Sequence, residues 1–264
     1  MKVSIITVCK NAKDSIEETI ESVLKQSYQD IEYIVIDGGS HDGTREVLLG
    51  YKDKVSKVIF EKDDGIYDAM NKGLKIAKGE IIGILNADDY YLQDTIKDIH
   101  EVFVNSKADI VYGKMYVFNS EFQILKAVNE DIPTNVKNNK LHRVHPTCFI
   151  KRGCYQNLSF DSNLKVAGDL DLLNNLIKDG YEIKKLDKFL TVMRDGGRSA
   201  NFSLEYLKII YRDIGVITMI KELFKYLVRY LMKKIFDFFP KRIRLAIYKN
   251  ILHYKTKSSA EFIR

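Results

Sequence analysis

The feature that most constrains this chain is a short apolar run that ends in acidic residues. Residues 81–85 read Ile-Ile-Gly-Ile-Leu, and Asn-Ala-Asp-Asp follows directly. A run of this length is too short for a helix and is typical of a strand buried on both faces, as in the centre of a parallel sheet. Open α/β sheets bind ligands just beyond the carboxyl ends of such strands. The run therefore predicts a central strand with a ligand site at its end.

Two oxygen-bearing side chains follow this strand at a spacing that suits a cation. Alternation along an extended chain places Asn86 and Asp88 on the same side, and Asp89 on the other. Hard oxygen ligands of this kind suit Mg²⁺ or Mn²⁺ that also holds a diphosphate. The alternative is a solvated acidic turn that closes a strand, and the spacing alone does not decide between the two.

Around this strand, apolar segments of strand length alternate with amphipathic helical segments over the first hundred residues. Such alternation predicts βαβ units and a parallel sheet. A hairpin expected around residues 119–121 makes the sheet mixed, and the chain beyond residue 203 is expected to be almost entirely helical. Strands are expected at 3–8, 31–36, 58–61, 80–85, 109–112, 115–118, 123–128 and within 182–192, and helices at 15–26, 45–50, 66–77, 93–104 and 169–178.

Charge divides the chain into two unequal parts. The net charge of the 264 residues is +6, but residues 221–264 hold 12 Lys and Arg against three acidic residues, a net of +9, so residues 1–220 carry −3. A mildly acidic body argues against a nucleic-acid groove, whereas a basic tail indicates an anionic partner.

Cysteine content and hydropathy bear on the compartment. Cys9, Cys148 and Cys154 are odd in number and lack metal-ligand spacing, which indicates reduced thiols in the cytoplasm. We expect no signal peptide, because the apolar segment after Met1 has only strand length, and no segment approaches the length of a spanning helix.

The loop after the first strand excludes two common phosphate-binding motifs. A dinucleotide-binding unit would carry G-x-G-x-x-G there, and a P-loop protein G-x-x-x-x-G-K. The chain has Cys-Lys-Asn-Ala-Lys-Asp at residues 9–14 instead. A metal held by acidic side chains is the obvious substitute for binding phosphate.

A series of short motifs occurs in a fixed order along the first 205 residues. They are the segments 3–8 with Asn11, 22–28, 32–40 with 42–44, 64–73, 79–89, 145–147, 167–172 and 196–199. Taken together, these motifs resemble those of bacterial family 2 glycosyltransferases with a GT-A fold, of the colanic-acid, O-antigen and exopolysaccharide type. The resemblance covers residues 1–205 and leaves residues 206–264 as a basic, amphipathic helical extension. It implies a nucleotide-diphospho-sugar transferase, with a Rossmann-like mixed sheet flanked by helices.

The resemblance implies a nucleoside pocket at the ends of the first two strands. Asp37 would accept a hydrogen bond from the base, typically uracil, and Thr7 and Asn11 would line the same pocket. The alternatives are that Asp37 only caps the following turn and that the other two make ordinary strand-end hydrogen bonds.

A second polar set opens the helix that begins near residue 66. Asp64, Asp68, Asn71 and Lys72 recur at helical spacing on one face. The helix dipole alone would explain the acids in the first turn. The resemblance instead directs this face to the cleft, with Asp64 nearest the ribose or sugar and Asn71 and Lys72 as further donor contacts.

The resemblance also assigns the residues around the diphosphate. Asn86 stands in the first position of the family's D-x-D element, so Asn86 and Ala87 would contact the donor and Asp88 would be the metal ligand. Arg198, with Arg194 nearby, would place positive charge near the leaving diphosphate, although solvated loop cations would look the same. His145 lacks a partner at ligand spacing and is interpreted as lining the acceptor side.

The catalytic base is expected in Gly-Asp-Leu-Asp-Leu at residues 168–172. Residues two apart on a helix point roughly 200° apart, so only one of Asp169 and Asp171 can face the cleft. The family pattern places the base at the first, Asp169, with Gly168 in place of the usual Glu or Ala. The alternative is that both acids only favour the positive end of a helix.

A second amphipathic helix is predicted in the basic tail. Its apolar arc contains Ile220, Phe224, Leu227, Val228, Leu231, Ile235, Phe238 and Phe239, with Lys221, Lys225, Arg229 and Lys233 mostly opposite. Lys234 lies within the apolar arc, from which its long side chain can extend to water. Basic and aromatic amphipathicity of this kind favours contact with an anionic membrane surface. The alternative is that the apolar arc packs on the catalytic domain or on a second copy of the chain.

The sequence thus predicts an inverting glycosyltransferase on the inner face of a bacterial cell membrane. It would move a sugar from a nucleotide-sugar, UDP-linked by the resemblance, to a lipid-linked or polysaccharide acceptor, with Mg²⁺ or Mn²⁺. A sugar nucleotidyltransferase shares the sheet and the acidic metal site, and a non-catalytic polysaccharide-assembly partner would share the fold.

Overall fold

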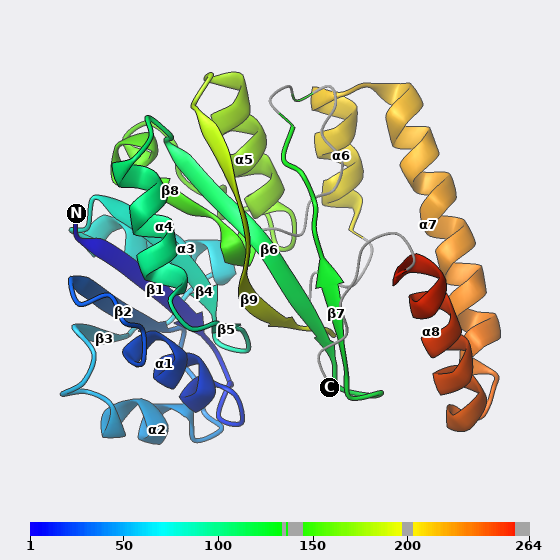
Figure 1. The fold of residues 1–264 in the computed structure, drawn as a ribbon, viewed down its shortest axis with the longest axis horizontal. Coiled ribbons are helices and arrows are strands. Elements are labelled where there is room, and N and C mark those ends of the chain that lie inside the picture. Colours follow the sequence, from blue (N-terminus) through cyan, green and yellow to red (C-terminus); the bar gives the residue numbers. More distant parts are fainter. Residues whose placement is uncertain (134–135, 137–144, 197–202, 257–264) are drawn as a thin grey trace.

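The computed structural model describes residues 1–133, 136, 145–196 and 203–256. A nine-stranded mixed sheet with helices on both faces forms its core, and a helical segment follows at the carboxyl end (Figure 1). The strands are β1 Val3–Cys9, β2 Ile31–Asp37, β3 Lys57–Phe60, β4 Ile81–Asn86, β5 Tyr90–Tyr91, β6 Ile110–Asn119, β7 Ile124–Val128, β8 Phe149–Lys151 and β9 Ile183–Arg194. The helices are α1 Ile16–Leu24, α2 Thr44–Gly50, α3 Ile66–Ile76, α4 Thr95–Val104, α5 Gly168–Lys178, α6 Leu204–Asp213, α7 Val216–Asp237 and α8 Lys241–Thr256, with single 3-10 turns η2 His145–Thr147 and η3 Arg152–Tyr155.

The sheet changes from parallel to mixed at β4. Its strand order is β3-β2-β1-β4-β8-β6-β9-β5, and β7 pairs with β6. Strands β1 to β4 are mutually parallel, whereas β8 runs antiparallel to β4. β4 thus has neighbours on both sides, and Ile81–Leu85 are all buried. The predicted central strand and the α/β fold are confirmed.

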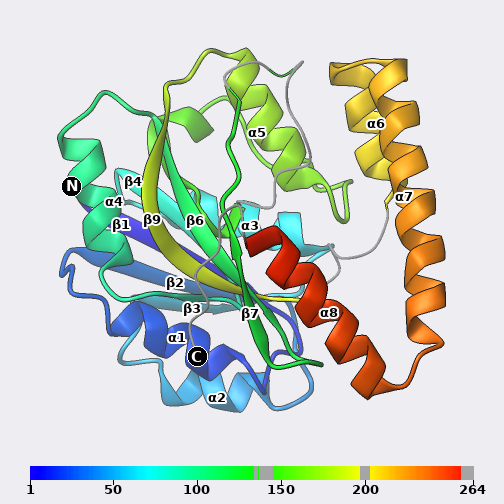
Figure 2. The ribbon, with the colours of Figure 1, turned by 45° about the vertical axis from the view of Figure 1, so that its right-hand side comes forward.

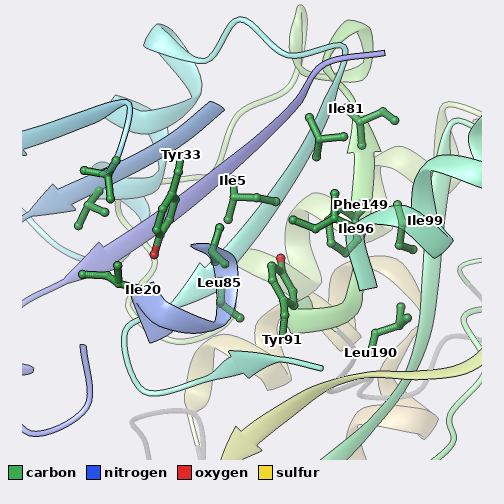
Figure 3. Close-up of a cluster of buried hydrophobic side chains, with 14 of the residues drawn as sticks. Ile5, Ile20, Tyr33, Ile81, Leu85, Tyr91, Ile96, Ile99, Phe149 and Leu190 are labelled. Carbon is green, nitrogen blue, oxygen red and sulfur yellow. The ribbon is translucent and has the colours of Figure 1, made fainter. Parts of the chain in front are cut away.

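Side chains alternate between two apolar layers, one on each face of the sheet. Ile5 packs with α1, α2 and α4, and Figure 3 shows part of this layer around Tyr33, Tyr91 and Phe149. Ile6 points to the other face and packs with α3 and α5. Each fully buried aliphatic side chain of this kind contributes about 1.5–3 kcal/mol by removing apolar surface from water. The layers therefore fix β1 and β4 in place at the centre of the sheet.

Some element boundaries differ from those expected. The hairpin is confirmed as β6 paired antiparallel with β7, but the two segments expected at 109–112 and 115–118 form one strand. The strands expected within 182–192 also form one strand, β9, which pairs in parallel with β6 and has two register shifts along the pairing. The short strands β5 and β8 were not expected, because two or three residues carry no periodic pattern.

Helix α6 is fastened to α5 by an ionic network. The predicted boundary between residues 205 and 206 falls in its first turn, and Ile209 and Ile210 are buried. The carboxylate of Asp213, only 1% exposed, accepts hydrogen bonds from Lys178 at 2.6 Å, Arg212 at 2.7 Å and Asn174 at 2.8 Å. Burial alone would raise the pKa of Asp213, but these donors outweigh it and lower the pKa to about 2.

We expect Asp213→Asn to lower the melting temperature at pH 7. The loss of a charged acceptor costs on the order of 1–2 kcal/mol, which corresponds to about 2–8 °C for a chain of this size. Because the folded-state pKa is depressed, the stabilisation is full above the unfolded value near 4 and is lost as the pH falls toward 2. The difference between wild type and variant should therefore shrink below about pH 5. A constant difference down to pH 3, or an equal loss in the exposed control Asp53→Asn, would contradict this.

Candidate active site

A large cavity opens at the carboxyl ends of β1 and β4. β1 pairs with β2 on one side and with β4 on the other, so the strand order reverses here, the position at which open α/β sheets bind ligands. The cavity has a volume of about 2020 Å³. Its polar lining includes Asn11, Asp63, Asp64, Asn86, Asp88, Asp89, His145, Lys165, Asp169 and Arg194.

The turn after β4 brings two carboxylates and an arginine together. Both acids line the cavity: Asp88 is half-buried, whereas Asp89 is only 2% exposed and accepts a hydrogen bond from the Arg194 backbone N–H at 3.1 Å. Burial raises the pKa of Asp88, and Arg194 opposes the shift. Burial, and then the neighbouring Asp88, hold the pKa of Asp89 well above its usual range. The Arg194 Nε donates to the Asp88 carbonyl at 3.2 Å, and the guanidinium pairs with Glu18, so this arginine fixes the turn.

The residues at this turn fit a divalent cation that takes its remaining ligands from a substrate. The Asn86 Oδ1 is buried and has no hydrogen-bond partner among the described residues. This unsatisfied acceptor oxygen, two residues before Asp88, is available to a ligand or a cation. No group of three or more His, Cys, Asp or Glu residues in the described part of the chain is arranged to hold a metal ion. Mg²⁺ and Mn²⁺ are commonly held by one or two protein oxygens together with substrate phosphates and water.

The predicted nucleoside residues fall into two groups. Asn11 lines the cavity with φ at 54°, where its Oδ1 accepts the His41 N–H at 3.0 Å. Thr7 is fully buried and 3.0 Å from the Tyr33 hydroxyl. Asp37 is 2% exposed and accepts the Ser40 N–H and hydroxyl, which is the turn-capping role. Thr7 and Asp37 therefore form the second group, because neither is among the described residues that line the cavity.

The polar face of α3 is divided in a similar way. Asp64 lines the cavity. Asn71 bonds the Phe160 backbone through both amide atoms, at 2.8 and 3.0 Å, and Lys72 pairs with Glu61 at 2.8 Å and with Asp68 at 3.3 Å. Asn71 and Lys72 are not among the described residues that line the cavity, and both hold α3 to neighbouring segments.

The two acids of α5 point in different directions. Asp169 lines the cavity, and the Tyr67 hydroxyl donates to its Oδ1 at 3.4 Å. Asp171 is 8% exposed and pairs with Arg212 on α6 at 2.6 Å. A Cβ at Gly168 would lie 2.8 Å from the Tyr67 ring, so glycine is the residue that admits this tyrosine beside Asp169.

His145 lies in the same wall as Asp169. Its ring meets Phe160 edge-on, with 6.1 Å between centroids. Burial lowers the pKa of His145, and the nearby Asp169 opposes that shift. A neutral imidazole beside a carboxylate suits the lining of a substrate pocket. Arg198, the remaining predicted site residue, lies outside the described residues.

Sequence reasoning missed Glu205 and Lys165, which hold the segment before Asp169. The Glu205 carboxylate accepts the backbone N–H groups of Lys165, Val166 and Ala167 at 2.9–3.2 Å. The Lys165 Nζ donates to the Asp64 carbonyl at 2.8 Å. The N-cap at Ser203, whose Oγ accepts the Glu205 backbone N–H at 3.1 Å, marks only the start of α6. A carboxylate that bonds a segment forty residues away leaves no pattern in the sequence. These contacts join α6, α5 and the loop before α3 around the cavity.

A family model described as glycosyl transferase family 2 matches residues 4–158 of the chain, which is more than half of it. The chain belongs to this family. It is therefore a glycosyltransferase, and the resemblance seen in its motifs is confirmed.

Curated relatives agree with this membership. The chain is 30% identical over 251 residues to a UDP-Glc:alpha-D-GlcNAc-diphosphoundecaprenol beta-1,3-glucosyltransferase, WfaP, of Escherichia coli, covering 91% of this chain and 98% of the relative. It is 29% identical over 214 residues to EpsJ, an uncharacterized glycosyltransferase of Bacillus subtilis, covering 75% of this chain but only 62% of EpsJ.

Solved structures support the fold. Residues 1–349 of TarS from S. aureus superpose with a TM-score of 0.62 at 21% identity, covering 80% of this chain and 63% of that one. The same TarS segment in complex with UDP-GlcNAc gives a TM-score of 0.61 at 21% identity, covering 80% of this chain and 64% of that one. The GT-A-like sheet predicted from the motifs is thus confirmed.

Proposed function

We propose that this glycosyltransferase moves a sugar, with inversion, from a UDP-linked donor to a hydroxyl of a lipid-linked or polysaccharide acceptor in surface polysaccharide synthesis. One observation carries the proposal: Asp88, next to the unpartnered oxygen of Asn86, and Asp169 line one cavity at the point where the strand order reverses. The names of WfaP and of the TarS complex, which include UDP-sugars, support the choice of donor.

The reaction needs a base on the acceptor side and charge neutralisation on the donor side. Asp169 accepts the proton of the acceptor hydroxyl as its oxygen attacks the anomeric carbon, and the bond to the donor diphosphate breaks on the opposite face. Asp88 and the Asn86 Oδ1 would hold Mg²⁺ or Mn²⁺, which when bound neutralises the departing diphosphate. His145 lines the wall next to Asp169 and suits the acceptor side.

Donor contacts come from the loops that surround the cavity. Asn11, Asp64, Ala87 and Asp88 line it and are placed to touch a nucleotide-sugar. The other predicted donor residues act on the donor through the loops and the helix that they hold, and these are Thr7, Asp37, Asn71 and Lys72. The predicted contact of Arg198 with the diphosphate stays a prediction. Membership in the family removes the nucleotidyltransferase alternative, and no observation favours a non-catalytic role.

The donor assignment predicts a metal-dependent thermal shift. Uridine diphosphate with Mn²⁺, at one hundred times its dissociation constant, should stabilise the protein by about 2.7 kcal/mol, or about 5–10 °C. Asp88→Ala should lose the Mn²⁺-dependent part of the shift, and the exposed control Asp53→Ala should keep it. If no nucleoside diphosphate raises the melting temperature at any Mn²⁺ concentration, the donor assignment is wrong.

The base assignment predicts unequal effects of two neighbouring substitutions. Asp169→Asn should keep the shift by uridine diphosphate while transfer falls by about 10²–10⁴-fold. Asp171→Asn should keep most of the transfer activity and lower the melting temperature, because it weakens the contact with Arg212. The assay is release of uridine diphosphate from UDP-sugars in the presence of a bacterial lipid extract. Near-normal turnover in Asp169→Asn would remove this residue from the mechanism.

The tail supports a peripheral position on the inner face of an anionic membrane. The apolar arc of α7 is turned to solvent: Phe224 is 66% exposed, Leu231 58% and Phe238, just after the helix, 89%. Residues 221–264 hold 12 basic and three acidic residues. The exposed apolar arc and this net positive charge together favour an interfacial helix. Among the described residues, no helix is both long and apolar enough to cross a bilayer.

The membrane assignment is tested on the full chain with vesicles that contain phosphatidylglycerol. Phe224→Glu/Leu231→Glu should reduce co-sedimentation several-fold, because both side chains are exposed on one face of α7 and would insert. The control Leu49→Glu/Val104→Glu changes two exposed apolar side chains on α2 and α4, which are 51% and 58% exposed. Unchanged sedimentation would contradict the assignment. A loss of self-association in size-exclusion chromatography, with sedimentation unaffected, would assign the face to a second copy.

A further inference from the structure

Helix α7 turns its polar side toward the catalytic cavity and its apolar side to solvent. In Figures 1 and 2 it lies at the end of the molecule remote from β2 and β3, next to α6. We call the residues of α7 that line the cavity its inner face: Glu222, Lys225, Tyr226, Tyr230, Lys233, Lys234 and Asp237. They recur every three or four residues, as one side of a helix does. The same cavity therefore extends from the carboxylates of the catalytic centre to a wall that carries lysines and tyrosines.

The inner face carries three lysines and two acids. Lys225 is paired with Glu222, and Asp237 lies 3.8 Å from the Arg244 guanidinium, so each acid of the face already has a basic partner. Lys234 stands 5.1 Å from the centre of the Tyr230 ring. Within the part of the chain that the structure describes, neither Lys233 nor Lys234 forms an ion pair with an acid. Two adjacent lysines in a cavity wall suit an anionic ligand.

The donor does not supply that anion. Its diphosphate is assigned to the opposite end of the cavity, where Asp64, Asp88, Asp89 and Asp169 call for a cation rather than for lysines. The back of the same helix, with Phe224 and Leu231, is the face assigned to the membrane. A ligand that enters the cavity beside α7 would therefore bring its anionic group to the inner face while a lipid tail stays in the bilayer.

We propose that Lys233 and Lys234 bind the phosphate groups of a lipid-linked acceptor. The inference rests on the proposed function and decides between its two acceptor classes, in favour of a lipid phosphate or diphosphate that carries the acceptor sugar. Tyr226 and Tyr230 flank the site on the inner face. The anchoring of the phosphates by α7 leaves the sugar free to reach Asp169.

Binding of farnesyl diphosphate to the full-length protein, with uridine diphosphate and Mn²⁺ already saturating, tests this directly by titration calorimetry. Lys233→Ala/Lys234→Ala should lower the affinity for farnesyl diphosphate at least tenfold and leave the affinity for uridine diphosphate unchanged. The matched control Lys208→Ala/Lys221→Ala removes two exposed lysines of α6 and α7 that lie outside the cavity lining, and it should bind as the wild type does.

Farnesol and pyrophosphate separate the contributions of the tail and the phosphates. Each should bind at least tenfold more weakly than farnesyl diphosphate. Equal loss in the control variant, no binding to the wild type, or unchanged affinity in Lys233→Ala/Lys234→Ala would overturn the proposal. If pyrophosphate binds as tightly as farnesyl diphosphate, the claim that the bound phosphates belong to a lipid is wrong. Failure of uridine diphosphate to bind the wild type would instead count against the proposed donor.

Discussion

The structure depends on the parallel pairing of β1 with β4 at the centre of the sheet. Both strands are buried on two faces, so every backbone N–H and C=O must find a neighbouring strand, and the pairing opposite Val8 fixes where Asn86 ends β4. The turn that follows is held by the Arg194 backbone and guanidinium. Both acids lie in the cavity lining, but Asp88 is half-buried whereas Asp89 is only 2% exposed, and the proposed donor side of the site follows from that arrangement.

The proposed acceptor side of the cavity depends on contacts made by α6. Glu205 caps the three backbone N–H groups before α5, and Arg212 binds Asp171, so Asp169 is the acid that is left to the cavity. Because α6 continues through Gly215 into α7, the helix assigned to the membrane and the segment that carries the proposed base belong to one connected unit. A protein that acts at a membrane surface gains from such a connection, since docking and the position of the base are then set by the same elements.

Much of the fold was predictable from sequence because its signals are local. The apolar strands, the polar turns at their ends and the βαβ alternation gave the sheet and the position of Asp88. Partners distant in the chain were not predictable: Glu205 bonds a segment forty residues away, and Asn71 bonds Phe160. Helical periodicity identified the two faces of α7, but it left open which face meets the protein, and in the structure it is the polar one.

We propose that the donor diphosphate and its cation bind at the end of β4. Anomalous diffraction from crystals grown with uridine diphosphate and Mn²⁺ tests it most directly, because the metal position is then observed independently of activity. We expect a single strong Mn²⁺ peak at bonding distance, about 2.0–2.3 Å, from a carboxylate oxygen of Asp88 and in contact with the diphosphate. A peak at another carboxylate, with the diphosphate remote from Asp88, would contradict it.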